Sequence, residues 1–345
     1  MTTLFETELR EQPATLERLL TQGREKALAI ADRIRTYQPH CAVIAARGSS
    51  DNAARYGQYL FGIQNQLLAS LATPSLFTQY HAAPSLAGAL VVGISQSGQS
   101  PDIVAVIEEA RRQRALTLAV TNEEGSPLAA AAELVLPLLA GAERAVAATK
   151  TYTAQALALA MLSAALRNQD PLWAELGALP ERVARTIDAN AGCLEWAHRY
   201  AGHDRLIVVG RGYNLSTALE ITLKIKETSG IMADGYSSAD FFHGPKAILD
   251  RNLPVLAVAP GRVFEELDGV IRLAQEKGSP LVVLSDRREI LEAADVALPL
   301  PTGTPEWLSP IAAVVPGQLW ALGLSLARGA DPDRPPGLSK VTETR

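Results

Sequence analysis

The chain has 345 residues, 48% of them hydrophobic and 20% charged, a length and composition that favour a globular protein of two domains. Its formal net charge of −5 argues against nucleic acid as the main partner, because binding a phosphate backbone requires a basic surface. The longest apolar stretch that we identify, residues 154–166, is too short to cross a bilayer, and the N-terminus lacks a signal-peptide pattern. We therefore expect a cytoplasmic protein without membrane contact. The two cysteines, Cys41 and Cys193, argue against a disulfide scaffold and a structural zinc site.

Short apolar segments alternate with helical segments along the chain. Strands are predicted near residues 41–45, 89–94, 117–121, 133–138, 206–209, 254–259, 280–284 and 296–300. Helices are predicted between them at 52–61, 102–113, 213–229 and 264–277, with further amphipathic helices in 1–36 and 171–199. The alternation predicts parallel sheets with helices on both faces, whose ligands bind beyond the carboxyl ends of the strands. The final segment, 331–345, is rich in proline and then polar, so we expect it to need a partner to become ordered.

The two halves of the chain resemble each other at a constant spacing of 164 residues. Arg47-Gly48 matches Arg211-Gly212 at this spacing, and Val106-Ile107 matches Val270-Ile271. Further along, Leu136-Pro137-Leu138 matches Leu298-Pro299-Leu300 after a loss of two residues. A spacing maintained over the length of a domain predicts two copies of one domain rather than a short-period solenoid.

The most informative segment is the loop Gly93-Ile94-Ser95-Gln96-Ser97-Gly98-Gln99-Ser100-Pro101-Asp102. Ser100 is a good N-cap and Pro101 a good first helical residue, so the loop should lie at a helix N-terminus, where an anion is favoured. No lysine follows Gly98, so this is not a P-loop, and the Gly-x-Gly-x-x-Gly fingerprint is absent. Neutral donors suit a single phosphomonoester, and the alternative is an ordinary polar turn. The corresponding segment of the second copy, Ala259-Pro260-Gly261-Arg262, has no hydroxyls, so only the first copy should hold a phosphate.

A few ionisable residues are candidates for chemistry. Glu227 and Lys224 are three residues apart and share a helix face, so they form either a surface ion pair or a base inside a buried helix. His243 precedes a Gly-Pro turn that would present its ring, although a single histidine is often structural. Lys340 is either a solvated tail residue or an amine that needs a desolvated pocket. No His, Cys, Asp or Glu cluster has the spacing of metal ligands, so we expect no metal site.

Several segments together resemble the sugar isomerase (SIS) family, in particular the isomerase half of glutamine–fructose-6-phosphate transaminase and the deaminases that lack its glutaminase. They are Arg47-Gly48-Ser49-Ser50, 93–98, Val146-Ala147-Ala148-Thr149-Lys150, 223–227, Phe242-His243-Gly244-Pro245, Leu308-Ser309-Pro310-Ile311 and Leu338-Ser339-Lys340-Val341-Thr342. The resemblance implies two tandem SIS domains, each a five-stranded parallel sheet in an αβα sandwich, and a homodimer in which His243 reaches the partner's active site. Phe241 and Phe242 beside it would supply apolar contact at that interface. We accordingly divide the chain into a helical segment 1–36, SIS domains at 37–170 and 200–330, a linker 171–199 and an active-site tail 331–345.

The resemblance also implies roles for single residues. Ser50, Ser95, Gln96, Ser97 and Ser100 would hold a sugar 6-phosphate, with Gly48 and Ser49 beside them in the substrate site. Glu227 would move a proton between C1 and C2 with Lys224 nearby, and His243 would open the sugar ring. Lys340 would contact the open-chain carbonyl or imine carbon. Val146 and Ala147 would line the sugar pocket through their backbone. No metal or organic cofactor is implied.

The expected function is deamination of glucosamine 6-phosphate to fructose 6-phosphate, an aldose–ketose isomerisation coupled to release of ammonia. No glutaminase domain precedes the first SIS domain in this sequence, so we expect no use of glutamine as the ammonia donor. An alternative enzyme is a deglycase that acts on a 6-phosphorylated fructose–amine conjugate. An alternative of another class is a sugar-phosphate-binding regulator without catalysis, which the two domains and the absence of a basic N-terminal module disfavour.

Overall fold

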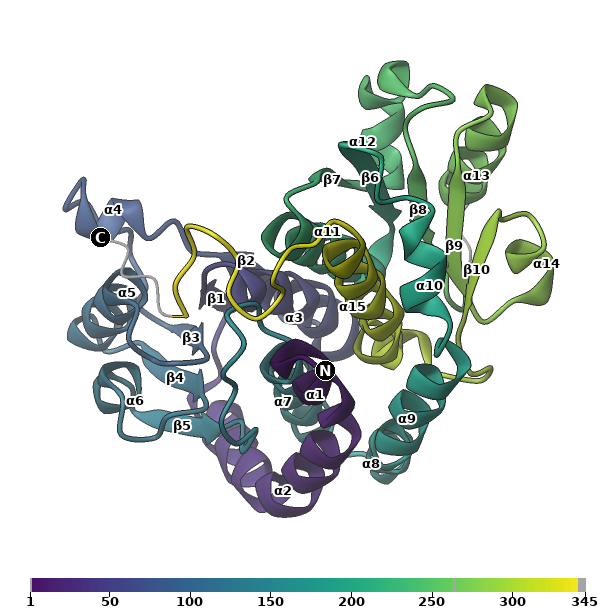
Figure 1. Cartoon of the computed structure of the whole chain (residues 1–345). Coiled ribbons are helices and arrows are strands. Elements are labelled where there is room, and N and C mark those ends of the chain that lie inside the picture. The colour runs from purple at the N-terminus through teal and green to yellow at the C-terminus, as the bar shows by residue number, and fades with distance from the viewer. Residues whose placement is uncertain (1, 263–264, 341–345) are drawn as a thin grey trace. The chain divides into compact units, whose positions relative to one another are not determined.

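The computed structural model describes residues 2–262 and 265–340, and these fall into two compact units (Figure 1). The first-sheet unit comprises 14–143, 150–178 and 339–340, and the second-sheet unit comprises 2–13, 144–149 and 179–338 within the described ranges. Each unit is described by itself. His243 and the loop 259–262 therefore belong to the second-sheet unit, and the loop 93–102 and Lys340 belong to the first.

The first-sheet unit is built on a five-stranded parallel sheet with the order β2-β1-β3-β4-β5. Its strands are β1 (Cys41–Ala45), β2 (Ala69–Leu71), β3 (Ala89–Ser95), β4 (Leu116–Thr121) and β5 (Leu134–Pro137). Its helices are α2 (Gln12–Tyr37), which begins two residues before this unit, α3 (Ser49–Asn65), α4 (Ser75–Thr78), α5 (Pro101–Arg112), α6 (Pro127–Ala131), α7 (Lys150–Arg167) and α8 (Asp170–Gly177). Every residue of β3 and β4 is buried, as expected for central strands with helices on both faces.

The second-sheet unit repeats this topology, because its strands have the order β7-β6-β8-β9-β10 when read from the matching edge. The strands are β6 (Arg205–Gly210), β7 (Met232–Ser237), β8 (Val255–Val258), β9 (Leu281–Ser285) and β10 (Val296–Pro299). The helices are α1 (Leu4–Arg10), α9 (Leu179–Ala189), α10 (Cys193–His198), α11 (Leu215–Ser229), α12 (Ser238–Phe242), α13 (Glu265–Lys277), α14 (Arg288–Leu291) and α15 (Ser309–Ala327). Three short 3-10 turns lie at Gly212–Asn214, Pro245–Ile248 and Glu306–Leu308. The predicted fold class, two tandem parallel αβα domains, is confirmed.

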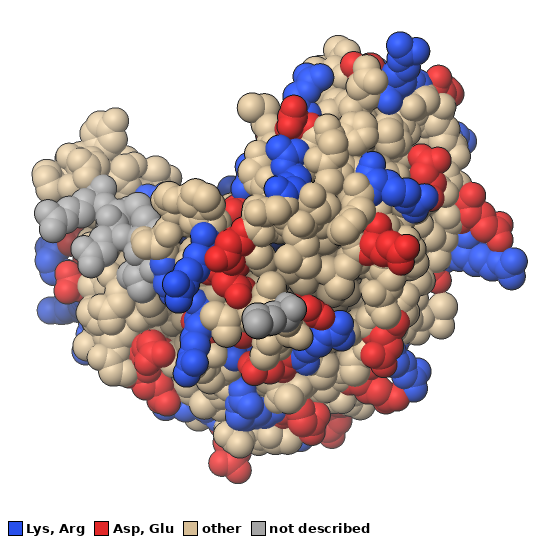
Figure 2. All heavy atoms as spheres, in the orientation of Figure 1, with Lys and Arg blue, Asp and Glu red and all other residues tan. Residues whose placement is uncertain are grey.

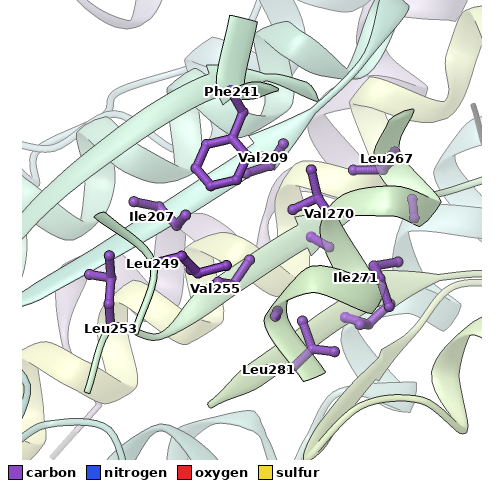
Figure 3. Packing of buried hydrophobic residues seen from close by; sticks show 14 residues of the cluster. Ile207, Val209, Phe241, Leu249, Leu253, Val255, Leu267, Val270, Ile271 and Leu281 are labelled. Atoms are coloured by element: carbon purple, nitrogen blue, oxygen red, sulfur yellow. The ribbon is translucent and has the colours of Figure 1, made fainter. Parts of the chain in front are cut away.

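One apolar core of this unit lies between its sheet and α13 (Figure 3). Val209 and Val255 come from the strands, Val270 and Ile271 come from α13, and the ring of Phe241 enters from α12. Phe241 is fully buried there. The buried apolar positions of α13 recur three and four residues apart and face the sheet, which is the pattern of an amphipathic helix. Residue 264, which the sequence analysis places in this helix, lies outside the described residues.

The sequence pattern located eight of the ten strands and missed the edge strands β2 and β7. Both edge strands lack a continuous apolar run, since β2 has only three residues and β7 includes the polar segment Asp234-Gly235. The opposite edge strands, β5 and β10, keep a continuous apolar run and were predicted, so the short or interrupted run of β2 and β7 is what weakens their pattern. The resemblance to a five-stranded family, rather than periodicity, supplied the missing strand of each sheet.

The segment Glu306–Ala327, which contains α15, is long and apolar enough to cross a membrane by length and composition. The sequence analysis overlooked it when it took residues 154–166 as the longest apolar stretch. In the described structure 89% of its most apolar window is buried inside the protein. Burial of this kind is typical of a central helix in a globular core, where the helix is hydrophobic all round.

Candidate functional site

The hydroxyl-rich loop connects β3 to α5 in the first-sheet unit. Ser95 ends β3, Ser100 occupies the N-cap position of α5, and Pro101 is its first residue, as the sequence predicts. The Ser100 hydroxyl makes no capping hydrogen bond to its own helix. The first backbone N–H groups of α5 therefore lack this common side-chain cap, an arrangement that favours an anion.

The serine hydroxyls of the loop are fixed by backbone donors. The Ser95 Oγ accepts a hydrogen bond from the Gly98 N–H at 3.1 Å, and the Ser97 Oγ accepts one from the Gln99 N–H at 3.3 Å. A hydroxyl that accepts through its lone pair still has its own proton to donate. Both serines are thus oriented as donors to a further acceptor. The Gln96 carbonyl accepts from the Asn122 N–H at 3.1 Å, which holds the loop against the end of β4.

Gly98 is required by the geometry of this loop. Its φ angle is +63°, a left-handed conformation that side chains disfavour. A Cβ atom at this position would lie 2.1 Å from the Ser126 Oγ, far inside contact distance. The loop can therefore fold in this way only with glycine at position 98.

A second loop, Gly48-Ser49-Ser50, leaves the neighbouring strand at the same sheet edge. β1 pairs with β3 in parallel, with its last residue Ala45 opposite Gly93, so the carboxyl ends of both strands lie at the same edge and β3 extends two residues further. Gly48 has φ +56° and lies at the N-terminus of α3. Ser50 is buried, and its Oγ accepts from the Gln155 Nε2 of α7 at 2.9 Å. The N-termini of α3 and α5 thus lie at one edge of the sheet, together with the serine hydroxyls.

The corresponding loop of the second-sheet unit is built differently. There the Gly261 N–H donates to the Asp286 Oδ1 at 2.6 Å, so a carboxylate of the chain occupies the place of an anion. The position 164 residues earlier is Asn122, which is neutral and whose side chain bonds the backbone of Ala140 and Gly141. The two loops thus differ in the partners of their backbone N–H groups, and phosphate binding by the first copy alone stays a prediction.

Lys224 and Glu227 lie on α11 of the second-sheet unit. The Lys224 ammonium is fully buried and contacts two carboxylates. It donates a close hydrogen bond to Glu227 and forms an ion pair with Glu220 at 3.5 Å. Glu220 is also fully buried, whereas the Glu227 side chain is 23% exposed. A carboxylate held by a buried ammonium and open to solvent on one side is suited to proton transfer. The pair is therefore not the ordinary surface ion pair that the spacing alone allows.

His243 caps the C-terminus of α12 and is exposed. Gly244 follows with φ +134°, which only glycine adopts readily, and turns the chain after the histidine. We had expected Phe241 and Phe242 to supply apolar contact at an interface between subunits. For Phe241 this is wrong, because its ring is fully buried in the core of its own unit. Phe242 is partly buried, with the Lys246 ammonium 5.3 Å from its ring centre.

The segment 144–149 is held by the N-terminal helix and the tail of the second-sheet unit. The Glu8 carboxylate accepts from the backbone N–H groups of Arg144 and Ala145, the latter at 3.2 Å. The Asp333 carboxylate accepts from the Leu4 and Phe5 N–H groups at the start of α1, at 2.8 and 2.7 Å. The Val146 N–H donates to the Asp333 carbonyl at 3.1 Å, which leaves only the carbonyl of Val146 for a sugar. Ala147 is buried.

Lys340 is paired with a buried carboxylate in the first-sheet unit. Its Nζ donates to the Glu143 Oε2 at 2.9 Å, and Glu143 also accepts from the Thr151 N–H at 3.1 Å and from the Thr151 hydroxyl at 2.6 Å. Burial raises the pKa of Glu143, but the Lys340 charge and the Thr151 hydrogen bonds outweigh it and hold that pKa below its ordinary value. The solvated-tail interpretation of Lys340 is therefore wrong. Val341 and Thr342, the last two residues of the family-like motif, lie outside the described residues.

Two carboxylates escaped the sequence analysis. Glu220 lies four residues before Lys224, a spacing that places both on one helix face and could have indicated the pair. Glu143 has no such signal, because its partner is 197 positions away in the chain. Among the residues that the structure describes, no three His, Cys, Asp or Glu side chains form a group that could hold a metal ion.

The described surface carries both charge signs. Figure 2 shows basic and acidic side chains mixed over one face, in keeping with the small net charge of −5.

Two sheets of one topology, with a hydroxyl-rich loop at a helix N-terminus in the first copy, define a tandem α/β protein of the sugar-isomerase type. The SIS domain model matches residues 37–165 and again 200–328, so the chain belongs to the SIS domain family. The resemblance carried by its motifs is thereby confirmed.

Several relatives match nearly the whole chain. An isomerizing glutamine–fructose-6-phosphate aminotransferase of Thermococcus kodakarensis is 35% identical over 343 residues, which cover 96% of this chain and 56% of the relative. The chain thus spans about half the length of the curated relatives that it matches. A crystal structure from Silicibacter pomeroyi, named as a candidate phosphosugar isomerase, has 33% identity and a TM-score of 0.85 and covers 96% of this chain and 100% of its own. The C-terminal domain of a glucosamine-fructose-6-phosphate aminotransferase from Francisella tularensis has 25% identity, a TM-score of 0.85 and coverages of 97% and 99%.

Proposed function

We propose that this chain is a phosphosugar isomerase that deaminates glucosamine 6-phosphate to fructose 6-phosphate and ammonia. The observation that carries the proposal is Glu227, a partly exposed carboxylate held by the buried ammonium of Lys224. A base of this kind serves isomerisation, in which one proton moves between neighbouring carbons. The hydroxyl-rich loop of the first-sheet unit would bind the 6-phosphate through Ser50, Ser95, Gln96, Ser97 and Ser100. The names of the relatives, isomerases and isomerizing aminotransferases, favour an enzyme over a regulator.

The reaction would begin with opening of the sugar ring, assisted by His243. Glu227 would then take the C2 proton of the open-chain aldehyde, which gives an enolamine, and return it to C1. Water would hydrolyse the resulting C2 imine to the ketone and ammonia. Such a general base contributes about 10²–10⁴-fold to the rate. Lys224 would keep the Glu227 carboxylate in place, since it is fixed between Glu227 and Glu220.

Lys340 would act at the carbonyl end of the open-chain sugar. In the structure it is an ammonium paired with Glu143, so it can donate a hydrogen bond to the carbonyl oxygen as it stands. To form a Schiff base it would first have to lose a proton, because only the neutral amine is a nucleophile. The carbonyl of Val146 and the backbone of Ala147 would line the sugar pocket.

A panel of amino-sugar phosphates tests the proposed reaction. Ammonia release is measured with glucosamine 6-phosphate, with its galacto epimer, with unphosphorylated glucosamine and with a 6-phosphorylated fructose–amine conjugate. We expect release from glucosamine 6-phosphate and none from glucosamine. Cleavage of the conjugate without any deamination would instead assign the chain as a deglycase. Ammonia from glutamine would contradict the proposal that this chain uses no glutamine.

The proposal also includes a cytoplasmic location and the domain boundaries 37–170 and 200–330, with a linker between them and a tail after them. It further includes a homodimer in which His243 serves the partner's active site. The exposed position of His243 at the end of α12 supports it. Mixing His243→Ala with Glu227→Ala subunits should then restore part of the activity that each variant lacks. Absence of complementation in dimers shown to exchange subunits would place His243 in the active site of its own chain.

A further inference from the structure

We propose that Arg47 is a charged ligand of the bound phosphate, an inference that rests on the proposed function and adds a hydrogen-bond donor to it. Arg47 lies two residues after the end of β1 and directly before Gly48, at the sheet edge where the carboxyl ends of β1 and β3 lie. It therefore occupies the same edge as the Ser95–Ser100 loop.

Arg47 is oriented by the helix that the loop precedes. Its Nε donates to the Oδ2 of Asp102 at 2.8 Å, and Asp102 belongs to the first turn of α5. The other oxygen of Asp102 accepts from the Ile103 N–H at 2.9 Å. Asp102 is 1% exposed, whereas the Arg47 side chain is 51% exposed. One edge of the guanidinium is thus fixed on a buried carboxylate, and the rest of this side chain remains accessible.

The charges at this edge require a cation when a phosphate binds. A phosphomonoester carries about −1.5 to −2 charges at neutral pH. The proposed loop residues are neutral, and each helix N-terminus supplies only about half a positive charge. Asp102 adds a negative charge in the first turn of the same helix, which by itself would repel the ligand. A guanidinium paired with Asp102 cancels that charge, and its planar array of donors suits phosphate oxygens.

The second copy of the domain contains the corresponding pair and serves as an internal reference. Arg211 and Glu266 lie 164 residues after Arg47 and Asp102, and their side chains approach to 3.9 Å. Glu266 is 46% exposed, so the buried anchor of the first copy is absent at that position. The neighbouring loop lacks hydroxyls, and its Gly261 N–H is already bonded to Asp286. A phosphate role would belong to Arg47 alone. A role in compensating the buried Asp102 carboxylate would instead appear as a lower melting temperature of an Arg47 variant with unchanged phosphate affinity.

The test measures the affinity of the full chain for inorganic phosphate by titration calorimetry, with glucosamine 6-phosphate as a second probe. We expect Arg47→Gln to weaken phosphate binding about 10- to 100-fold, the usual effect of removing charge-assisted hydrogen bonds. Arg47→Lys, which keeps the charge, should weaken it less. The matched variant Arg211→Gln should bind phosphate as the unmodified chain does. Affinity in Arg47→Gln should also depend less on ionic strength.

Equal phosphate affinity in Arg47→Gln and the unmodified chain would overturn the proposal. An equal loss in Arg211→Gln would overturn it as well, and so would an unmodified chain that binds no phosphate. The melting curve of Arg47→Gln shows whether this variant folds. If it does not, the phosphate affinities of Arg47→Lys and Arg211→Lys are compared instead. Equal phosphate affinities of these two variants would overturn the proposal. The result is separable from the proposed function, because Arg47 is judged by phosphate affinity and the proposed function by release of ammonia.

Discussion

Lys340 and Glu143 are separated by 197 positions in the chain, yet the Lys340 Nζ donates to the Glu143 Oε2 at 2.9 Å. The carboxylate is fully buried and the lysine side chain is 24% exposed. A residue five positions before the last one is thus part of the structure of the first-sheet unit. The proposed catalytic role of Lys340 and the stability of the fold are consequently coupled.

Replacing Lys340 by Met should lower both turnover and stability. The substitution leaves the buried Glu143 carboxylate without its cation, which costs about 2–3 kcal/mol of unfolding free energy after allowance for the remaining Thr151 hydrogen bonds. The double variant Lys340→Met with Glu143→Gln should recover most of that stability and none of the activity. Urea unfolding and turnover of the two variants check this. Full activity in the stable double variant would show that Lys340 has no part in catalysis.

The stability contributed by Glu143 should disappear in acid. The pKa of Glu143 in the folded chain lies below its ordinary value of 4.5, so between these two values the unfolded chain binds more protons than the folded one. The contribution is therefore complete above about pH 5 and falls as the pH drops through the lowered pKa. Urea unfolding from pH 7 to pH 3 should show a stability difference between the unmodified chain and Glu143→Gln that shrinks below pH 5. A difference that grows in acid would contradict the sign of this pKa shift.

Removing the hydroxyls of the loop should weaken substrate binding. Ser95→Ala combined with Ser97→Ala deletes two donors that the Gly98 and Gln99 N–H groups orient, which should cost roughly 3–6 kcal/mol of binding if both contact the phosphate. The readout is the KM for glucosamine 6-phosphate, with the melting temperature as a control for the loop. The matched control removes the hydroxyl of Ser285 in the second-sheet unit, which bonds the Ala259 carbonyl and should leave KM unchanged. An unaltered KM in the double variant would exclude this loop as the phosphate site.

Glu227 and Lys224 should respond differently to replacement. Glu227→Gln leaves Lys224 paired with Glu220, so we expect a normal melting temperature and a loss of turnover of about 10²–10⁴-fold. Lys224→Met leaves the buried Glu220 carboxylate uncompensated and should destabilise the chain by about 3–5 kcal/mol. Thermal melting and kcat distinguish the two variants. Substantial turnover by a folded Glu227→Gln variant would assign the proton transfer to another group.

The sequence predicted the fold well because apolar periodicity reports burial directly. Central strands such as β3 and β4, buried throughout, were located almost to the residue, and the repeated spacing revealed two copies of one domain. The strands β2 and β7 were missed because β2 has only three residues and the apolar pattern of β7 is interrupted at Asp234-Gly235. Phe241 was misplaced for a related reason, since an aromatic residue beside a turn has the same local sequence whether it faces solvent or a core.

The candidate site was predictable where its residues adjoin in sequence. The Ser95–Ser100 loop and the Lys224–Glu227 pair both have local signals, a strand-to-helix junction and a helical spacing. Glu143 has none, because its function in the fold depends on a partner near the other end of the chain. Such pairs arise from tertiary structure, which no window of neighbouring residues contains.

The most direct test of the proposed reaction follows the hydrogen at C2. Glucosamine 6-phosphate carrying deuterium at C2 is incubated with the chain, and the product and solvent are analysed by mass spectrometry and NMR. The proposal predicts release of ammonia, with deuterium at C1 of fructose 6-phosphate or washed into the solvent, because one base takes the C2 proton and returns a proton to C1. The proposal would be contradicted if Glu227→Gln formed fructose 6-phosphate as fast as the unmodified chain. It would also be contradicted if ammonia were released while deuterium stayed at C2.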